Sequence, residues 1–383
     1  MSSLLPSAAV IDRFLSAALR GDAPEWPWDA GRAVTAAVMA RIDLHGVSVL
    51  LHENGNPRSW PDAIRAALRE RGLAQGMWEL RHQHLLGDTL QALRQADIRP
   101  VLLKGTALAY SLYRSPIQRT RADTDLLIAE QDRERCDQVL QAAGYRRAVA
   151  VSGEHVNYQA TYTRELPGQT HALDLHWRIS NSELLAGLFT YEELRRTAEP
   201  LPRLGPDALG IDRISALLHA CFHRSVHQHH PYHVDGIAHH EPNRLVWLKD
   251  IDLLVRSLTP DEWRQAGRQA RDKGLGAVCL DGLGQARVQL HTPLPADTAS
   301  VFAPAALEAP RRYLAAGPLE QQWLDFQALG TSQRKLKFLR ELFFPPAAYM
   351  RASSHSGRGP LAWLYLRRAT KGLVKGLTRR HRG

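Results

Sequence analysis

The chain has 383 residues, of which 44% are hydrophobic, and a formal net charge of +10. A chain of this length can bury a substantial core and is expected to form one large or two medium domains. No stretch reaches the roughly 18 to 20 uninterrupted apolar residues of a membrane span, and the first residues lack a signal peptide's order of charged, apolar and small residues. We therefore expect a cytoplasmic protein. The three cysteines are odd in number and far apart, which argues against a disulfide framework or a thiolate zinc site.

Residues 1–98 are expected to form a helical N-terminal region. From about residue 8 onward, apolar residues recur three and four positions apart, with breaks at Pro27 and at 55–57. The stretches 60–74 and 78–98 each show the pattern of an amphipathic helix, and we expect two separate helices there.

Residues 99–200 are expected to form a compact α/β core. The apolar run 99–105 ends in glycine, as a buried strand leading into a turn does. Helices and strands then alternate, and strands predominate towards the end. The expected elements are a helix at 106–114, a strand at 124–130, a helix at 131–145 and strands at 146–152, 156–166 and 171–179. This order predicts an α+β fold with a small mixed β-sheet and helices on one face.

Residues 201–346 are predicted to form a helical C-terminal region, followed by a basic tail at 347–383. From Arg351 onward the tail holds nine Lys or Arg and no acidic residue, so the remainder of the chain is close to neutral. Its cations alternate with apolar residues such as Trp363 and Leu364. This pattern is compatible with a helix docked on the body, with peripheral contact at an anionic inner-membrane surface, or with nucleic-acid binding.

Three aspartates in two strand-like segments are the main indication of the chemistry of this protein. Asp123 and Asp125 are two residues apart, so their side chains share one face of a strand, and Asp174 can join them from a neighbouring strand. Converging carboxylates repel one another unless cations neutralise them. Hard oxygen ligands select Mg²⁺ or Mn²⁺ over zinc. With the Gly105–Thr106 turn upstream, the pattern predicts metal-assisted transfer of a nucleotidyl or phosphoryl group.

The segments 102–147 and 172–180 resemble a nucleotidyltransferase family of uncharacterised bacterial proteins, within the wider polymerase-β-like superfamily. The resemblance depends on an LKG turn, an Asp-x-Asp-Leu-Leu strand, a helix ending in Gly-Tyr and an Asp-x-His-Trp strand, in that order. With the helical segments further on, it covers about residues 75–290. Sixteen residues separate Thr106 from Asp123, which is more than in many members. The intervening loop is expected to close over the substrate or to pass around it.

The resemblance implies a role for each matching residue. Asp123, Asp125 and Asp174 would be the catalytic metal ligands, and Asp174 would also assist the attacking group. The residues expected to bind the nucleotide are Lys104, Gly105, Thr106, Arg119, Arg121 and His176. Backbone N–H groups at the glycine turn would hold phosphates, Lys104 would add a point charge, and the arginines would clamp phosphate oxygens. His176 would orient a carboxylate, touch substrate or be a hydrogen-bonded strand residue.

The expected function is a Mg²⁺-dependent (or Mn²⁺-dependent) nucleotidyltransferase. It would move a nucleoside monophosphate from a nucleoside triphosphate to an acceptor that the sequence does not identify, whether a protein, an RNA, a metabolite or a glycan precursor. One alternative is a non-catalytic protein of the same fold whose basic tail associates with membrane or nucleic acid.

A second alternative arises from the histidines at 219–240. His219, His223 and His227 recur every four residues and so share a helix face, where two imidazoles can chelate a transition metal. Neither an accompanying Glu of an H-E-x-x-H motif nor a cysteine pair is present. The other interpretation is that these histidines face the active site, or that their hydrogen-bonding groups are satisfied within the helix packing.

Overall fold

The computed structural model describes residues 5–54, 57–149, 153–234, 236–352, 360–368 and 370. The chain divides into two compact units, each made of two separate stretches. The first comprises Met1–Asp125 and Leu194–Glu308, and the second comprises Leu126–Glu193 and Ala309–Gly383. Strand β2 (Asp123–Leu127) is continuous across the boundary, so its first three residues belong to one unit and its last two to the other.

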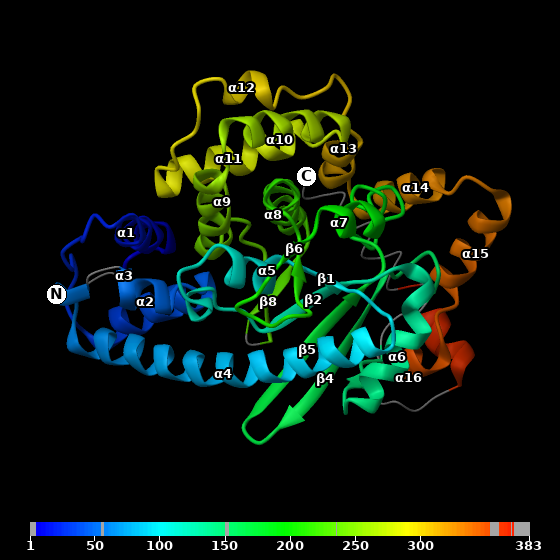
Figure 1. Ribbon diagram of the computed structural model, residues 1–383, viewed down its shortest axis with the longest axis horizontal. Coiled ribbons are helices and arrows are strands. Elements are labelled where there is room, and N and C mark those ends of the chain that lie inside the picture. Colours follow the sequence, from blue (N-terminus) through cyan, green and yellow to red (C-terminus); the bar gives the residue numbers. More distant parts are fainter. Residues whose placement is uncertain are drawn as a thin grey trace. The chain divides into compact units, whose positions relative to one another are not determined.

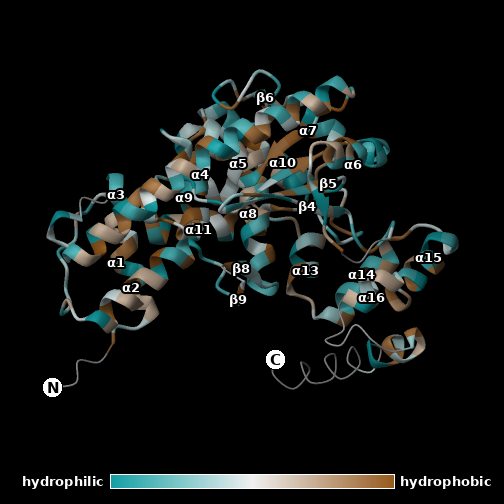
Figure 2. Ribbon diagram, turned by 90° about the horizontal axis from the view of Figure 1, so that it is seen from below, coloured by the Kyte–Doolittle hydropathy of each residue, from teal (hydrophilic) through white to brown (hydrophobic). Residues whose placement is uncertain are grey.

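The first unit begins with helices that pack on one another through apolar faces. They are α1 (Ala8–Arg20), α2 (Arg32–His45), α3 (Ser48–Asn54) and α4 (Asp62–Gln95). Helix α1 contacts α2 and α3, and α3 lies against α4. Apolar and polar segments alternate along α1 in Figure 2, as expected of a helix that buries one face. The described part of this N-terminal stretch is therefore mainly helical.

Helix α4 differs from the sequence-based prediction, because one continuous helix replaces two. It runs for 34 residues through Gly72 and Gly76 without a break, and it is the long helix drawn from blue to cyan in Figure 1. A glycine inside a helix costs only about 1 kcal/mol relative to alanine. Helices α2 and α3 pack against α4, and such tertiary packing can offset that cost.

A mixed β-sheet forms the α/β part of the fold. Its seven strands have the order β3-β4-β5-β2-β1-β7-β6. Besides β2, they are β1 (Val101–Leu103), β3 (Arg146–Arg147), β4 (Gln159–Leu166), β5 (Gln169–His176), β6 (Glu199–Pro200) and β7 (Leu209–Gly210). Strands β1 and β7 are parallel, whereas β3–β4, β4–β5 and β6–β7 are antiparallel. The predicted α+β class with a small mixed sheet is confirmed.

The predicted helices that alternate with these strands are also present. Helix α5 (Lys104–Ser111) follows β1 directly, and the short 3₁₀ turns η2 (Pro116–Gln118) and η3 (Glu130–Asp132) come before and after β2. Helix α6 (Arg133–Ala142) follows η3, and Gly144 takes a φ of 84° immediately after it. Glycine is the usual residue in this left-handed position.

Four short strands lie in or beside the region predicted to be purely helical. These are β6, β7, β8 (Tyr232–Val234) and β9 (Ile237–His239), the last two forming a separate hairpin. Strands of two or three residues are too short to show an alternating pattern, which is why the sequence did not reveal them. Strand β7 exists because its backbone pairs with β1, with Gly210 opposite Leu102.

The remaining helices of the first unit form a bundle. They are α8 (Arg213–His229), α9 (Leu245–Ser257), α10 (Pro260–Asp272), α11 (Gly276–Leu290) and α12 (Thr298–Val301). Helix α8 contacts α9, α10 and α11. The helix starts follow local capping chemistry: Asp212 accepts a hydrogen bond from the Ser215 N–H, and Thr259 and Glu262 form a capping box.

The second unit adds helices to its strands. They are α13 (Ala309–Ala315), α14 (Pro318–Ala328), α15 (Ser332–Phe343) and α16 (Ala347–Ala352), and α7 (Tyr191–Thr197) spans the boundary to the first unit. Asp325 on α14 accepts hydrogen bonds from the hydroxyls of Ser182 and Tyr313. These bonds join α13 and α14 to the loop that follows β5.

The basic tail is described only in part. In the described segment 360–368, Leu364 is buried and the Tyr365 hydroxyl donates to the Pro345 carbonyl oxygen at 2.7 Å, while Trp363 is exposed. Residues 371–383, which carry most of the predicted cationic surface, lie outside the described residues. Of the helices in the described ranges, none by itself has the length and apolar composition of a membrane span. Helices α2 and α3 meet that criterion together but bend by 105°.

Two glycines test how tightly the first unit is packed. A Cβ on Gly267 of α10 would lie 2.5 Å from the Val301 carbonyl oxygen, whereas a Cβ on Gly284 of α11 would meet nothing within 4 Å. We expect Gly267→Ala to lower the free energy of unfolding by about 1–3 kcal/mol and Gly284→Ala to raise it by about 0.5–1 kcal/mol. Denaturant titration of both variants measures this. Equal effects of the two substitutions would contradict the packing of α10 on α12.

Candidate functional site

The turn between β1 and α5 presents Lys104, Gly105 and Thr106. Leu103 is extended and Lys104 takes a φ of 49°, after which the chain enters the helix. A left-handed backbone is rare and costly for a residue other than glycine, and such residues concentrate at functional sites. The N–H groups of the first helical turn have no partners within the helix and favour anions. A strand-to-helix junction therefore lies where the phosphate-binding turn was predicted, and its role in binding phosphate stays a prediction.

Thr106 is buried, and its side chain is engaged inside the protein. Its hydroxyl oxygen accepts a hydrogen bond from Arg121 Nε at 2.9 Å and lies 3.0 Å from the hydroxyl of Thr124. Thr124 in turn lies 3.2 Å from His82 on α4. What the turn offers to a phosphate is consequently its backbone rather than this hydroxyl. The assignment of Thr106 to nucleotide binding stays a prediction.

Arg119 and Arg121, both expected to clamp phosphates, are buried in ion pairs. Arg119 Nε and Nη2 donate to both carboxylate oxygens of Asp250 on α9, at 2.7 to 3.0 Å, and Nη1 donates to the Thr120 carbonyl. Arg121 Nη2 donates to Glu79 of α4 at 2.7 Å. These pairs hold the loop between α5 and β2 against two helices. The loop is thus anchored at these positions, and the phosphate-clamp roles stay predictions.

The Arg119–Asp250 pair lies wholly inside the first unit. Both side chains are at most 7% exposed, and the Tyr113 hydroxyl also donates to Asp250 at 2.7 Å. Burial, followed by the charge of Asp250, raises the pKa of Tyr113, and this phenol therefore stays protonated. A buried guanidinium needs such a partner, because desolvating an uncompensated charge is costly.

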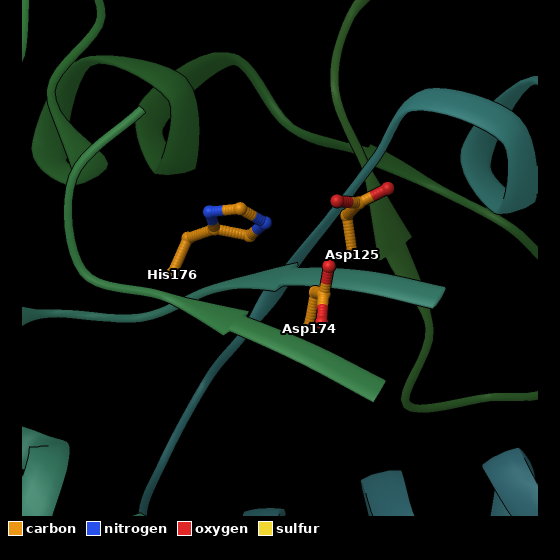
Figure 3. A group of neighbouring side chains, drawn as sticks. All are labelled: Asp125, Asp174 and His176. Carbon is orange, nitrogen blue, oxygen red and sulfur yellow. The ribbon is translucent and has the colours of Figure 1, made fainter. Parts of the chain in front are cut away.

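The predicted carboxylate cluster is formed in part. Ligand atoms of Asp125, Asp174 and His176 all lie within 4.8 Å of one another. In Figure 3 the carboxylate of Asp174 points towards that of Asp125, and the imidazole of His176 lies beside them on the same strand as Asp174. Two carboxylates and one imidazole suit a divalent cation such as Mg²⁺ or Mn²⁺, with Mn²⁺ more tolerant of the nitrogen ligand.

Strand geometry explains these positions. Asp174 and His176 are two residues apart on β5 and therefore share a face. Thr161 lies opposite Asp174 in the β4–β5 register, and its hydroxyl donates to Asp174 Oδ1 at 2.7 Å. The Ile128 N–H, just beyond β2, donates to the His176 carbonyl oxygen at 2.9 Å. The Thr161 hydroxyl thus fixes the orientation of Asp174, one of the predicted ligands. This contact was not anticipated from the sequence.

Asp123 is not part of this converging group. It lies on the same strand as Asp125 but is exposed, whereas Asp125 is buried. Among the described residues the structure brings together Asp125, Asp174 and His176. The alternation of the strand places Asp123 on the correct face, and its role as a ligand stays a prediction.

Lys104 neutralises Asp125 directly. Its Nζ donates to Asp125 Oδ1 at 2.6 Å, with 26% of the lysine side chain and 6% of the aspartate side chain exposed. The lysine and any cation held by the converging groups would therefore compete for the same carboxylate. This contact was not anticipated, because sequence reasoning assigned Lys104 to phosphates alone.

A small pocket adjoins Lys104 within the first unit. Its polar and aromatic lining comprises Lys104, Arg119, His219, His223, Trp247 and Asp250, and aliphatic side chains complete it. Trp247 contacts His223 edge-on, with ring centroids 5.0 Å apart, and stacks on His227 at the same separation. No sequence pattern pointed to Trp247, whereas Asp250 stands out as a charge within the apolar run of α9.

His223 and His227 of α8 are held neutral by their surroundings. Burial, and then the neighbouring His227, lower the pKa of His223 well below its usual value. Burial also lowers the pKa of His227, to about 4. Within the described parts of the chain, the side chains that converge on a common ion are those around Asp125, and the α8 histidines are not among them. Packing beside the pocket, rather than metal ligation, is what the structure shows for them.

Comparison with known proteins adds one match. The model of a family described as an uncharacterised nucleotidyltransferase matches residues 32–290, about two thirds of the chain. The matched segment includes the β1–α5 turn, the three side chains of Figure 3 and the helices that line the pocket. No curated protein matches the chain.

The buried Arg119–Asp250 pair yields a stability prediction. Asp250→Asn leaves a buried guanidinium uncompensated, so we expect the free energy of unfolding to fall by about 3–5 kcal/mol. In Arg119→Met/Asp250→Leu, which removes both charges, much of this loss should be recovered. Asp22→Asn, which removes the exposed partner of Arg20, should change the free energy of unfolding by less than about 1 kcal/mol. A loss of similar size at Asp22 and Asp250 would contradict this reading.

A second prediction concerns acid stability. His227 has a pKa of about 4 when folded, against an ordinary value of 6.5, so the unfolded chain binds more protons between those values. Stability is therefore expected to fall as the pH drops from 6.5 towards 4. His227→Phe, which keeps a ring against Trp247, should lose less stability on acidification than the wild type. Melting temperatures at pH 7 and pH 5 test this, with the exposed His84→Phe as the control that should match the wild type.

Proposed function

We propose, from the premise that this chain belongs to the uncharacterised nucleotidyltransferase family and is a transferase, that it moves a nucleoside monophosphate from a nucleoside triphosphate to an acceptor with the help of Mg²⁺ or Mn²⁺. The observation that carries this proposal is the convergence of Asp125, Asp174 and His176. The helix start at Gly105 supplies the anion-binding element that the same chemistry needs.

The residues present fit a divalent cation. Asp125 and Asp174 would hold it through carboxylate oxygens and His176 through a ring nitrogen, with the Thr161 hydroxyl fixing Asp174. When bound, the ion neutralises charge on the phosphate oxygens and helps to align attacking and leaving groups.

The remaining steps fall to the chain's own groups. The backbone N–H groups at Gly105 and Thr106 would receive phosphate oxygens, and the Lys104 ammonium would stabilise the charge that develops on the leaving pyrophosphate. The acceptor oxygen would attack the α-phosphorus and release pyrophosphate as the α–β phosphate bond breaks. The acceptor proton would pass to Asp174, the half-buried carboxylate of the group.

On the sequence alone, we also propose that the protein is cytoplasmic and contacts the inner membrane surface through its basic tail. A purely binding role for this fold is the alternative that the activity assay would decide.

The test determines which product receives a label placed on the nucleotide. Each nucleoside triphosphate, labelled either at the α- or at the γ-phosphate, is incubated with the protein, Mg²⁺ or Mn²⁺ and a lysate of the native host. Nucleotidyl transfer moves the α-label to the acceptor and releases the γ-label in pyrophosphate. Transfer of the γ-label would show phosphoryl transfer instead, and no metal-dependent transfer of either label would contradict the proposal.

Substitution of the ligands provides the corresponding prediction. We expect Asp125→Asn and Asp174→Asn each to lower the rate of transfer by about 10³-fold or more. Such a fall corresponds to the loss of several kcal/mol of transition-state stabilisation. The measurement is α-label transfer, with a cooperative melting transition confirming that each variant folds. Asp88→Asn, at an exposed position of α4, is the matched control and should keep full activity. Full activity in either ligand variant would refute the assignment.

A further inference from the structure

The carboxylate of Asp125 has two sets of neighbours that bear on its negative charge. Lys104 Nζ lies 2.6 Å from Oδ1 of Asp125, and the same carboxylate belongs to the group that converges with Asp174 and His176. A divalent cation on this carboxylate would lie within a few ångströms of the ammonium, and at that distance two positive charges repel strongly in a partly buried site. Cation binding and the Lys104–Asp125 contact therefore oppose each other.

The backbone places Lys104 where it can make this contact. Lys104 takes its left-handed φ of 49° at the junction of β1 and α5, a conformation that is unfavourable for lysine. Its neighbour Leu103 is fully buried in β1, and Gly105 follows in the first turn of α5. The strained residue is thus the one that carries the ammonium, between the strand and the phosphate-binding turn.

Lys104 also has room to leave Asp125. Its side chain lines the pocket that contains Arg119, His223 and Trp247, and about a quarter of it is exposed. A lysine side chain has four flexible carbons, so its ammonium can exchange one partner for another without movement of the backbone. The pocket side of the turn is the side on which this exchange can occur.

We propose that Lys104 is the resting counter-ion of Asp125, that a divalent cation displaces it, and that the released ammonium then pairs with the phosphates of the nucleotide. This inference rests on the proposed function and names a step within it. Lys104 is a positioning residue for the empty site and a phosphate ligand in the loaded one. The cost of displacing it makes the site weak for the metal alone, and triphosphate, which gives the ammonium a new partner, strengthens it.

Binding of Mn²⁺ alone to the full chain tests the proposal. The affinity is measured by isothermal titration calorimetry, or by the electron paramagnetic resonance signal of free Mn²⁺, without nucleotide or acceptor. Lys104→Met removes the competitor, so we expect Mn²⁺ to bind about tenfold more tightly than to the wild type, which corresponds to about 1.4 kcal/mol. In Lys104→Arg, which keeps a cation at this position, the affinity should stay near the wild-type value.

A matched control separates local competition from the general loss of a positive charge. Lys249 makes a similar contact, with Nζ 2.8 Å from Asp252 in α9. Asp252 keeps Arg256 and Thr292 as partners when this lysine is removed. Lys249→Met should therefore leave Mn²⁺ affinity unchanged. If it tightened Mn²⁺ binding as much as Lys104→Met does, the effect would be electrostatic and general, and the displacement would be refuted.

The outcomes separate this inference from the proposed function. If wild type binds Mn²⁺ and Asp125→Asn does not, but Lys104→Met binds it no more tightly than wild type, the displacement is wrong and the metal site survives. If Asp125→Asn binds Mn²⁺ as well as wild type, the metal site itself is wrong. Should Lys104→Met melt much earlier than the wild type, Lys104→Gln, which retains a polar side chain, provides the same comparison.

Discussion

A buried carboxylate needs a positive charge, and the arrangement around Asp125 follows from that need. Desolvation makes an isolated ionised aspartate costly inside a protein. Here the Lys104 ammonium meets the requirement at 2.6 Å, and the same carboxylate converges with Asp174 and His176. A lysine and a divalent cation are alternative solutions to one electrostatic problem. A site built in this way can be stable when empty and still accept a metal.

The same principle fixes the loop that leads into β2. Arg119 and Arg121 are placed in the protein interior, and each is matched by a carboxylate from a different helix, Asp250 of α9 and Glu79 of α4. Breaking either pair would leave a charge buried without compensation. The loop between α5 and β2 is therefore held at both arginines, which favours a rigid support for the turn at Gly105 over a lid that closes on the substrate.

The histidines illustrate how neighbouring groups decide chemistry. His223 and His227 lie beside Trp247, near Lys104 and Arg119, and both burial and nearby cations lower their pKa values. Neutral imidazoles next to a cationic turn do not add to its charge, and they can accept or donate hydrogen bonds in the pocket. Their regular spacing along α8 reflects packing against α9 as much as any function.

The sequence determined the class of fold and which side chains were candidates for the site. Hydrophobic periodicity was sufficient for the helical character of the N-terminal stretch, though not for the continuity of α4, and for strands β1, β2, β4 and β5, because these elements are long enough or apolar enough to show their period. The alternation of side chains along a strand put Asp123 and Asp125 on one face, with Asp174 expected to join them from a neighbouring strand, and of these three Asp125 and Asp174 converge. The glycine turn before α5 was also visible, because that backbone position is chemically restrictive.

Tertiary structure decided the rest, because it depends on contacts between residues far apart in the chain. The two-residue strands β6 and β7 exist only through pairing in the sheet. His176, rather than Asp123, converges with Asp125 and Asp174, which lie on strands that are neighbours in the sheet but far apart in the chain. Asp250 and Glu79 became partners of the arginines through helix packing. Local pattern thus fixes which groups are available, whereas packing of distant segments determines which charges meet.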